Sequence, residues 1–296
     1  IFTAEVCASD DDTTTCEMID LQIDNVNPTA EIDLTNTILI NAVPTFLAEV
    51  GEPVDFSGNS TDPGSDDLTL RWDWGDGSPV DETVDLVNPP DPDPFPSPSI
   101  QPRDVDVDTR HTFADACLYQ ISFWVEDDDG GVSATDTANV VIVGTALRAR
   151  HTGYWQHQYS GNGQIDFDEA TLQCYLDITG YMSSVFHEER DASTLPQAYD
   201  VLFMGQNGGS RVKKLDRQLL TVWLNVANGA MGYLDQFDTD GDGSPDTPLA
   251  DIMATAETVR LDPASSKREL REQTRLLIQI INQTYRRDLI SVFRFR

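Results

Sequence analysis

The chain has 296 residues, which is too long for one small domain and long enough for two domains that each bury a core. Its 51 acidic residues outnumber its 19 basic residues, and the formal net charge of −32 excludes nucleic acid as a natural partner because phosphates would be repelled. No apolar run approaches the roughly 20 residues that a membrane helix needs, so the sequence predicts no membrane span.

The charge is distributed unevenly. The segment from Lys267 to Arg296 holds eight basic and three acidic residues, a net charge of +5, so the preceding 266 residues carry −37. A basic tail on an acidic body favours head-to-tail contact between copies. A C-terminal helix that folds back onto its own acidic body explains the same distribution, and both interpretations stay open.

The chain has four cysteines, an even number that is typical of disulfide-bonded exported proteins. Cys7 and Cys16 would close a short loop and are the preferred first pair. That leaves Cys117 with Cys174, a bond that would join the first large domain to the second. Free buried thiols are the alternative.

Residues 1–26 have the pattern of a strand, an acidic turn at Asp10–Asp12 and a second strand, which predicts a β-hairpin. A lone hairpin is only marginally stable and exposes two edges, so something must cover it. Either an upstream domain is missing from this sequence, or the hairpin pairs with another copy by strand addition.

The segment from Leu68 to Gly77 joins a strand to a tight turn. Apolar Leu68, Leu70, Trp72 and Trp74 alternate with polar residues, the period of two that a strand with one buried face requires. The Gly75-Asp76-Gly77 sequence then favours a turn, because glycine adopts positive φ angles and an aspartate accepts backbone N–H bonds.

These residues resemble a known family. The sequence Trp72-Asp73-Trp74-Gly75-Asp76-Gly77 is similar to the WDFGDG signature of PKD (polycystic-kidney-disease) repeats, and Gly51–Ser57, His111–Phe113 and Tyr119–Val125 match its flanking strands. The resemblance covers about residues 27–144 and implies an extracellular immunoglobulin-like β-sandwich. Cys117 stands where the family usually has glycine.

Two further features are interpreted through this resemblance. The Pro- and Asp-rich insertion 79–110 has few large apolar groups to bury and is predicted to be a surface loop or flap rather than core. The N-terminal hairpin resembles the last hairpin of another PKD-like sandwich, with Asp10–Asp12 corresponding to Asp127–Asp129.

After Gly144 the pattern changes from period two to helical spacing, which predicts an all-α domain at residues 145–285. The predicted helices are Phe167–Glu188, Leu195–Met204, Arg211–Gln236, Leu249–Leu261 and Ser266–Thr284. The motifs Gly153–His157 and Leu219–Ala230 resemble a helical domain that ends many secreted bacterial surface proteins. That likeness implies location rather than chemistry.

The last segment, residues 286–296, is a basic tail that ends in Phe293-Arg294-Phe295-Arg296. Its alternation makes it a possible strand that docks on a neighbour's open sheet edge, while a frayed terminus is the other interpretation.

The loop from Asp238 to Asp246 is the strongest candidate metal site. Asp238, Asp240 and Asp242 alternate toward one centre, Gly243 supplies a sharp turn, and Ser244 and Asp246 offer further oxygens. Oxygen ligands in a flexible loop suit Ca²⁺. The loop resembles those of EF-hands, dockerins and thrombospondin type 3 repeats, except that Leu249 replaces the bidentate acid, and Asp251 is the candidate substitute. An acidic turn without metal is the alternative.

A weaker candidate calcium loop lies at residues 158–169, with possible ligands Ser160, Asn162, Gln164, Asp166 and Glu169. A metal-free loop that caps the following helix fits this segment equally well. A third candidate combines the acidic loop Asp62–Asp67 with Asp127–Asp129, and it resembles the ion-stabilised bends of PKD and cadherin-like domains.

The sequence has no zinc-protease helix, nucleophile elbow, P-loop or dinucleotide fingerprint, and its histidines (His111, His151, His157 and His187) are scattered. It therefore predicts a non-enzymatic, calcium-stabilised structural or adhesion protein, secreted to a prokaryotic cell surface. Such a protein would be a self-assembling subunit of a fibre or layer, joined through the hairpin and the tail, with other surface proteins or glycans as further partners. The alternative is a substrate- or polysaccharide-binding accessory region of a secreted hydrolase; a hidden carboxylate pair for glycoside hydrolysis stays open.

Overall fold

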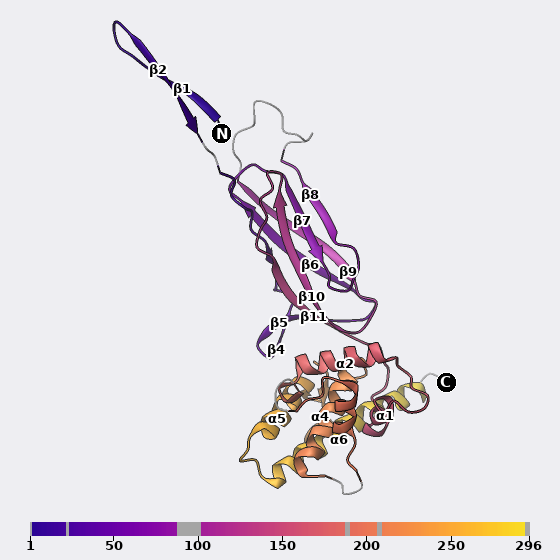
Figure 1. Cartoon of the computed structure of the whole chain (residues 1–296). Helices are drawn as coiled ribbons and strands as arrows, with labels where there is room; N and C mark the ends of the chain where they lie inside the picture. The colour runs from indigo at the N-terminus through magenta and orange to yellow at the C-terminus, as the bar shows by residue number, and fades with distance from the viewer. Residues whose placement is uncertain (1, 22–23, 88–101, 187–189, 206–208, 294–296) are drawn as a thin grey trace.

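The computed structural model of the chain describes residues 2–21, 24–87, 102–186, 190–205 and 209–293. Figure 1 shows three parts along the chain: an N-terminal hairpin, a β-sandwich and a helical region at the opposite end of the sandwich from the hairpin. The predicted fold class is therefore confirmed for the immunoglobulin-like sandwich and the helical region. No helix in these described stretches combines the length and apolar character needed to cross a membrane.

The N-terminal hairpin pairs β1 (Phe2–Ser9) with β2 (Thr14–Leu21) in antiparallel register, with Cys7 opposite Cys16. These cysteines form the predicted disulfide. The Asp10 carboxylate accepts the backbone N–H of Thr13 at 2.7 Å and shapes the turn. Val6, Met18 and Ile19 are all exposed, so the hairpin has no core of its own.

The sandwich has two sheets. The larger runs in the order β4 (Ile38–Ile40), β5 (Val43–Glu49), β11 (Asp136–Val143), β10 (Leu118–Asp127), β7 (Leu68–Asp73) and β8 (Asp81–Asp85). The smaller runs β3 (Glu31–Ile32), β6 (Pro53–Asp62) and β9 (Arg103–Thr112). Only β5 and β11 pair in parallel among these strands.

Aromatic rings fill the space between the two sheets. Trp72 stacks on Phe123 with a centroid distance of 4.4 Å and on Trp74 at 5.4 Å. Phe56, from the opposite sheet, lies 5.0 Å from Trp74. A Cβ at Gly58 would lie 2.9 Å from the Phe123 ring, so glycine keeps room for these rings. The alternation from Leu68 to Trp74 thus predicted the buried face correctly.

The insertion 79–110 differs from its prediction as a loop or flap. Strand β8 and most of β9 lie inside it, and β9 pairs with β6 over ten residues. Val107 of β9 is buried while Asp106 and Asp108 are exposed. This alternation has the period of two expected of a strand with one solvent-exposed face. The high Asp and Pro content of the segment made its alternating pattern resemble that of a solvated loop. Residues 88–101 lie outside the described residues.

The helical region contains α1 (Thr152–Gln158), α2 (Glu169–Met182), α3 (Leu195–Leu202), α4 (Arg211–Ala227), α5 (Leu249–Leu261) and α6 (Lys267–Phe293), with β12 (Gln236–Phe237) and β13 (Thr247–Pro248) between α4 and α5. Helix α4 is central, because every residue from Leu219 to Ala227 is buried. Helix α1 was not predicted, and the start and end of α5 match the prediction.

Three predicted segment ends need correction. Helix α2 ends at Met182 instead of Glu188. Helix α4 ends at Ala227 instead of Gln236, because the N–H of Asn228 bonds back to the Leu224 carbonyl and Gly229 then takes a positive φ. The backbone from residue 286 to Phe293 continues helix α6, where a possible strand was predicted. Residues 294–296 lie outside the described residues.

The sandwich is fastened to the helical region at several points. The predicted disulfide between Cys117 and Cys174 links the start of β10 to α2. The Thr45 hydroxyl lies 2.6 Å from the Tyr181 hydroxyl. The N–H of Gly144 donates to Ala227 at 2.9 Å. Because covalent and polar contacts act together, the two parts meet in a fixed interface.

Gly229 is expected to tolerate no side chain, because its φ is +81° and a Cβ would lie 1.7 Å from the Gly144 carbonyl oxygen. Gly229→Ala should lower the free energy of unfolding by more than about 3 kcal/mol in a urea titration. Gly51 has the same φ with no atom within 4 Å of its Cβ, so Gly51→Ala controls for backbone strain alone and should cost about 1 kcal/mol. Equal losses would contradict the steric explanation.

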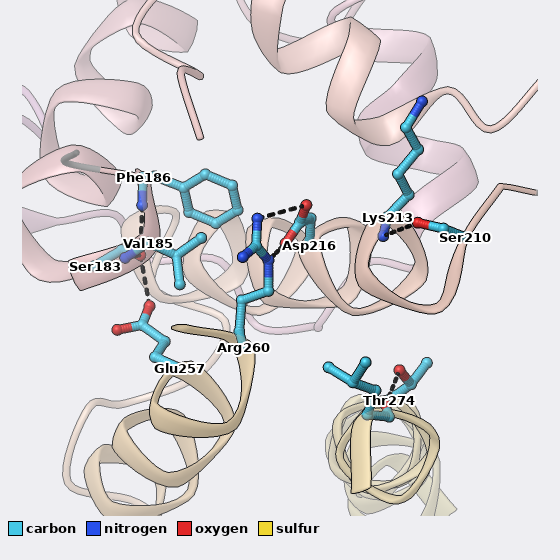
Figure 2. Close-up of polar contacts among 10 residues, drawn as sticks. Ser183, Val185, Phe186, Ser210, Lys213, Asp216, Glu257, Arg260 and Thr274 are labelled. Atoms are coloured by element: carbon cyan, nitrogen blue, oxygen red, sulfur yellow. Dashed lines mark hydrogen bonds and ion pairs between the residues drawn. The ribbon is translucent and has the colours of Figure 1, made fainter. Parts of the chain in front are cut away.

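The buried carboxylate of Glu257, on α5, reaches Ser183 at the end of α2 (Figure 2). One oxygen of Glu257 accepts hydrogen bonds from the Ser183 hydroxyl and, at 2.8 Å, from the Trp223 indole N–H, and the other accepts the Ser184 N–H at 2.9 Å. Nearby, Arg260 of α5 pairs with Asp216 of α4. Burial raises the pKa of both Glu257 and Asp216 above their usual values, although hydrogen bonds oppose the rise.

The Glu257 pKa predicts a pH dependence. Because the folded pKa lies above the unfolded value of 4.5, the native state holds this proton more tightly, and stability falls as pH rises from 4.5 through the folded pKa. Glu257→Gln should flatten this part of the stability–pH curve, measured by urea titration from pH 4 to 8. A slope that is unchanged in the variant would contradict the assignment.

Candidate metal centres

Three carboxylates converge at the end of the sandwich near the N-terminal hairpin. Asp62 ends β6, Asp66 lies in the following loop, and Asp127 ends β10. One carboxylate oxygen from each lies within 4.8 Å of the others. Asp62 is 2% exposed and Asp127 is 4% exposed. We name this group the sandwich cluster.

The sandwich cluster holds negative charge that its protein partners only partly balance. Asp127 accepts the Gly131 N–H at 2.6 Å and the Asn25 side-chain amide at 2.8 Å. Asp62 accepts the Gly64 N–H through Oδ1, while its buried Oδ2 has no hydrogen-bond partner among the described residues. Burial, reinforced by repulsion from Asp62 and other nearby acids, raises the pKa of Asp66 to about 6. A bound cation would relieve both conditions.

The linker from the hairpin reaches the same place. A Cβ at Gly131 would lie 2.3 Å from Asp127 Oδ2, 2.7 Å from the Asn25 amide nitrogen and 2.9 Å from the Asn27 amide oxygen. Oxygen donors from carboxylates and an amide, with no histidine or thiol, fit Ca²⁺ better than zinc. The buried Asp62 oxygen that lacks a hydrogen-bond partner is therefore the kind of ligand that a calcium site uses.

The sandwich cluster is the third of the metal sites that the sequence predicts, and the linker asparagines Asn25 and Asn27 are absent from that prediction. The acidic composition of 62–67 and 127–129 was the available signal. Only the pairing of β10 with β7, which places Asp127 opposite Leu68 just after the loop that follows Asp62, brings the ends of β6 and β10 together and selects Asp62, Asp66 and Asp127 among those acids.

A second acidic group lies in the loop between β12 and β13, where Asp238, Asp240 and Asp242 bring oxygens within 4.8 Å of one another. The two oxygens of Asp238 accept the N–H groups of Gly241 (2.6 Å) and Gly243 (2.9 Å). Both glycines have positive φ. The loop is thus folded around Asp238 much as a calcium loop folds around its first ligand.

Helix α6 contacts this loop through two glutamine side chains. The side-chain amides of Gln279 and Gln283 both donate to the Asp238 carbonyl, at 3.0 and 2.7 Å. The loop therefore has a rigid support, although its carboxylates are more exposed than those of the sandwich cluster.

Of the remaining predicted ligands of this loop, neither Asp246 nor Asp251 joins the acidic group. The Ser244 N–H donates to Asp242 at 2.7 Å, and Asp246 accepts from the Thr247 hydroxyl at 3.0 Å. Asp251 lies in the first turn of α5, and neither it nor Asp246 belongs to the clustered carboxylates. Metal binding by these three residues stays a prediction.

The weaker candidate loop at residues 158–169 makes local contacts. The Ser160 hydroxyl donates to the His157 carbonyl, Asn162 donates to the Ser160 carbonyl, and the Gln164 carbonyl lies 3.0 Å from the His157 ring nitrogen. Asp166 accepts from the Tyr154 hydroxyl at 2.7 Å. Glu169 begins α2, and its neighbour Asp168 provides the N-cap. This arrangement matches the helix-capping alternative, and calcium binding here stays a prediction.

Three histidines have packing or capping contacts. His111 stacks on Trp74 at 4.6 Å and lies 2.7 Å from Asp76, His151 caps α1, and His157 contacts Gln164. His187 lies outside the described residues. In the described part of the chain no histidine joins a group of possible metal ligands.

A cavity of about 660 Å³ lies between the sandwich and the helical region, beside the Cys117–Cys174 bond. Its lining includes Tyr119, Phe167 and the acidic residues Asp76, Asp115 and Asp168, and none of the described residues that line it is basic. Aromatic and carboxylate groups are suited to a neutral polyhydroxylated ligand or a cation, and not to an anion.

The PKD domain family model matches residues 38–140. These residues form a PKD domain. The PKD domain lies within the resemblance at 27–144 and accounts for the strands from β4 to most of β11, including β8 and β9. The match does not reach the helical region, whose likeness to C-terminal domains of surface proteins stays a prediction.

Solved structures similar to the chain include other PKD domains. One is the PKD domain of a peptidase from a Thermoplasmatales archaeon, with 17% identity over 39% of this chain and 92% of that chain and a TM-score of 0.24. Another is the PKD1 domain of Vibrio anguillarum Epp, with 16% identity over 40% and 99% and a TM-score of 0.23. A family 123 glycoside hydrolase from Clostridium perfringens has 11% identity over 53% and 36%, with a TM-score of 0.25. Among curated proteins, none matches the chain.

Proposed function

We propose that this chain is a calcium-stabilised, non-enzymatic structural protein of the prokaryotic cell exterior and that it assembles with copies of itself. A PKD domain suggests an extracellular adhesion or accessory module, and both disulfides are typical of extracellular proteins. The observation that carries the proposal is the sandwich cluster, in which Asp62 keeps a buried carboxylate oxygen without a partner.

Calcium would act on the fold rather than on a reaction. The ion would join Asp62, Asp66 and Asp127 to the linker asparagines, and so hold the hairpin linker against the sandwich. Ca²⁺ accepts about 6 to 8 oxygens, more than three carboxylates offer singly, which leaves places for the Asn27 amide and for water. The Asp238 loop would hold a second ion next to α6.

Self-assembly is proposed through the hairpin and the C-terminal tail. Strands β1 and β2 pair only with each other among the described residues, so each leaves one edge free for strand addition. The basic residues of the last segment complement the acidic remainder of a neighbouring copy.

Isothermal calorimetry tests the calcium proposal directly. Titration of Ca²⁺ into the chelator-treated chain should reveal two binding sites. The double variant Asp62→Asn with Asp127→Asn should remove one of them, and Asp238→Asn with Asp240→Asn should remove the other. Electron microscopy with and without Ca²⁺ tests for polymers. Absence of calcium binding at millimolar concentration would reject the proposal.

The interdomain cavity favours a second candidate function, the accessory region of a secreted hydrolase that binds polysaccharide. Tyr119 and Phe167 line the cavity beside carboxylates. Aromatic rings stack on the ring faces of sugars, and carboxylates accept hydrogen bonds from sugar hydroxyls. A pull-down on insoluble glycans distinguishes the candidates: retention that Tyr119→Ala abolishes would favour this function over the structural one.

A further inference from the structure

The outer face of the three-stranded sheet carries a regular array of carboxylates. In the register of the sheet Asn59 lies opposite Glu31 on one side and Asp106 on the other, and Ser57 lies opposite Asp108. Polar side chains therefore form a central row with acids on both sides. We name the acids of this array the acidic face: Glu31, Asp33, Asp104, Asp106 and Asp108.

Hydrogen bonds across the sheet hold three of the five carboxylates of this face in place. The Asn59 amide donates to Asp104 at 2.8 Å and to Asp106 at 2.9 Å, and the Ser57 hydroxyl donates to Asp108 at 2.7 Å. Between the two rows of acids lies a recess of about 500 Å³. The acidic face is thus a shaped surface, with its charges held in position before any partner arrives.

The acidic face lacks a counter-charge within the described part of the chain. The one basic side chain on the outer surface of this sheet is Arg110, and it is 2.6 Å from Asp55. The acids of the face appear in none of the ion pairs between described residues.

A surface of opposite sign lies on α6, in the helical region. Arg271, Arg275, Ile278 and Asn282 follow at intervals of four, three and four residues, so they share one face of the helix. All four are exposed, and neither arginine belongs to an ion pair between described residues. Arg275, Ile278 and Asn282 border a hollow of about 460 Å³. We name these four residues the arginine stripe.

A chain cannot bring these two surfaces together by itself. Leu277 and Ile280 anchor α6 in the helical core, where it packs on α4 and α5. The helical region is in turn fixed at the far end of the sandwich by the Cys117–Cys174 bond and the contacts around Gly144 (Figure 1). The arginine stripe therefore remains available to another molecule.

We propose that the acidic face of one copy binds the arginine stripe of a second copy. The two surfaces differ, so the contact is head to tail and leaves a free surface of each kind at the ends of the assembly. The inference rests on the proposed function in that the chain is an assembling subunit, and it adds a contact that uses neither the hairpin nor the tail at residues 286–296.

The proposed contact has a defined salt dependence. Its charges are solvent-exposed, so they attract over about 10 Å at 0.1 M salt and over about 3 Å at 1 M. Association should therefore be detectable at low ionic strength and at least about tenfold weaker at 0.5 M salt.

A charge-swap experiment on the full chain tests this contact by analytical ultracentrifugation in chelator. One variant carries Asp106→Arg and Asp108→Arg; the other carries Arg271→Glu and Arg275→Glu. Each alone should lose self-association, because the first variant lowers the net charge of the acidic face from −5 to −1, and the second gives the arginine stripe the same sign as the acidic face. The equimolar mixture should restore association, because the unchanged arginine stripe of the first variant can bind the unchanged acidic face of the second.

Arg211→Glu with Lys213→Glu is the matched control, because it makes the same change in net charge at exposed positions on α4 and should leave association unchanged. Circular dichroism melts of each variant check that it folds. A mixture that stays monomeric while the unmodified chain associates would overturn the inference, and so would association that needs Ca²⁺ and ignores both arginines.

These outcomes separate the inference from the proposed function. If calcium-dependent polymers form equally from the unmodified chain and from each swap variant, the inference fails while the proposed function stands. If the unmodified chain stays monomeric at every salt and calcium concentration, both fail.

Discussion

Removing calcium is expected to lower the melting temperature of the PKD domain by roughly 10 °C. A ligand that binds only the folded state contributes about 2.7 kcal/mol at 100 times its dissociation constant, and each kcal/mol moves the melting temperature of a domain of this size by about 4 °C or more. The physical cause is the sandwich cluster, where Asp62 has an unpartnered buried oxygen and the pKa of Asp66 is raised to about 6. Differential scanning calorimetry in EDTA and in millimolar Ca²⁺ measures the shift.

The sandwich cluster should account for this shift. Asp62→Asn with Asp127→Asn should reduce the difference between EDTA and Ca²⁺ to a few degrees. Glu49→Gln with Glu52→Gln removes the same charge at exposed positions of the same domain and should leave the shift intact. Identical melts of the unmodified chain in EDTA and in Ca²⁺ would reject a stabilising ion.

Loss of the interdomain disulfide is the second large effect. Cys117 and Cys174 are separated by 57 residues, so in the chain-entropy description their bond lowers the entropy of the unfolded state by an amount worth about 4 kcal/mol. Cys117→Ser with Cys174→Ser should reduce the free energy of unfolding by about this amount, measured by guanidinium titration with fluorescence of the tryptophans. The two domains should also unfold in separate steps, because their remaining fastenings are noncovalent.

The hairpin disulfide provides the control. Cys7 and Cys16 are separated by only 9 residues and belong to a hairpin without a core of its own. Cys7→Ser with Cys16→Ser should therefore leave the main unfolding transition unchanged. An equal loss from both double variants would contradict the idea that the Cys117–Cys174 bond acts by joining the two domains.

Periodicity predicted the elements whose pattern is strong. The alternation from Leu68 to Trp74 and the boundaries of α5 needed no tertiary information, because burial on one face dictates the spacing of apolar residues. The end of α4 was missed, because it depends on the close approach of Gly229 to Gly144, which lies 85 residues earlier in the chain. Strand β9 was missed because acids on its wet face made it resemble a solvated loop.

The sequence by itself determined that the chain contains a PKD sandwich and a helical region, since these follow from a family signature and local spacing, and it favoured the two cysteine pairings that the structure confirms. Tertiary structure decided which acids meet. Asp62 and Asp127 are 65 positions apart, and only the register of the sheets places their carboxylates together and leaves one oxygen buried without a partner. Composition fixes how much charge a chain carries, but distances between charges depend on packing, and electrostatic energy depends on those distances.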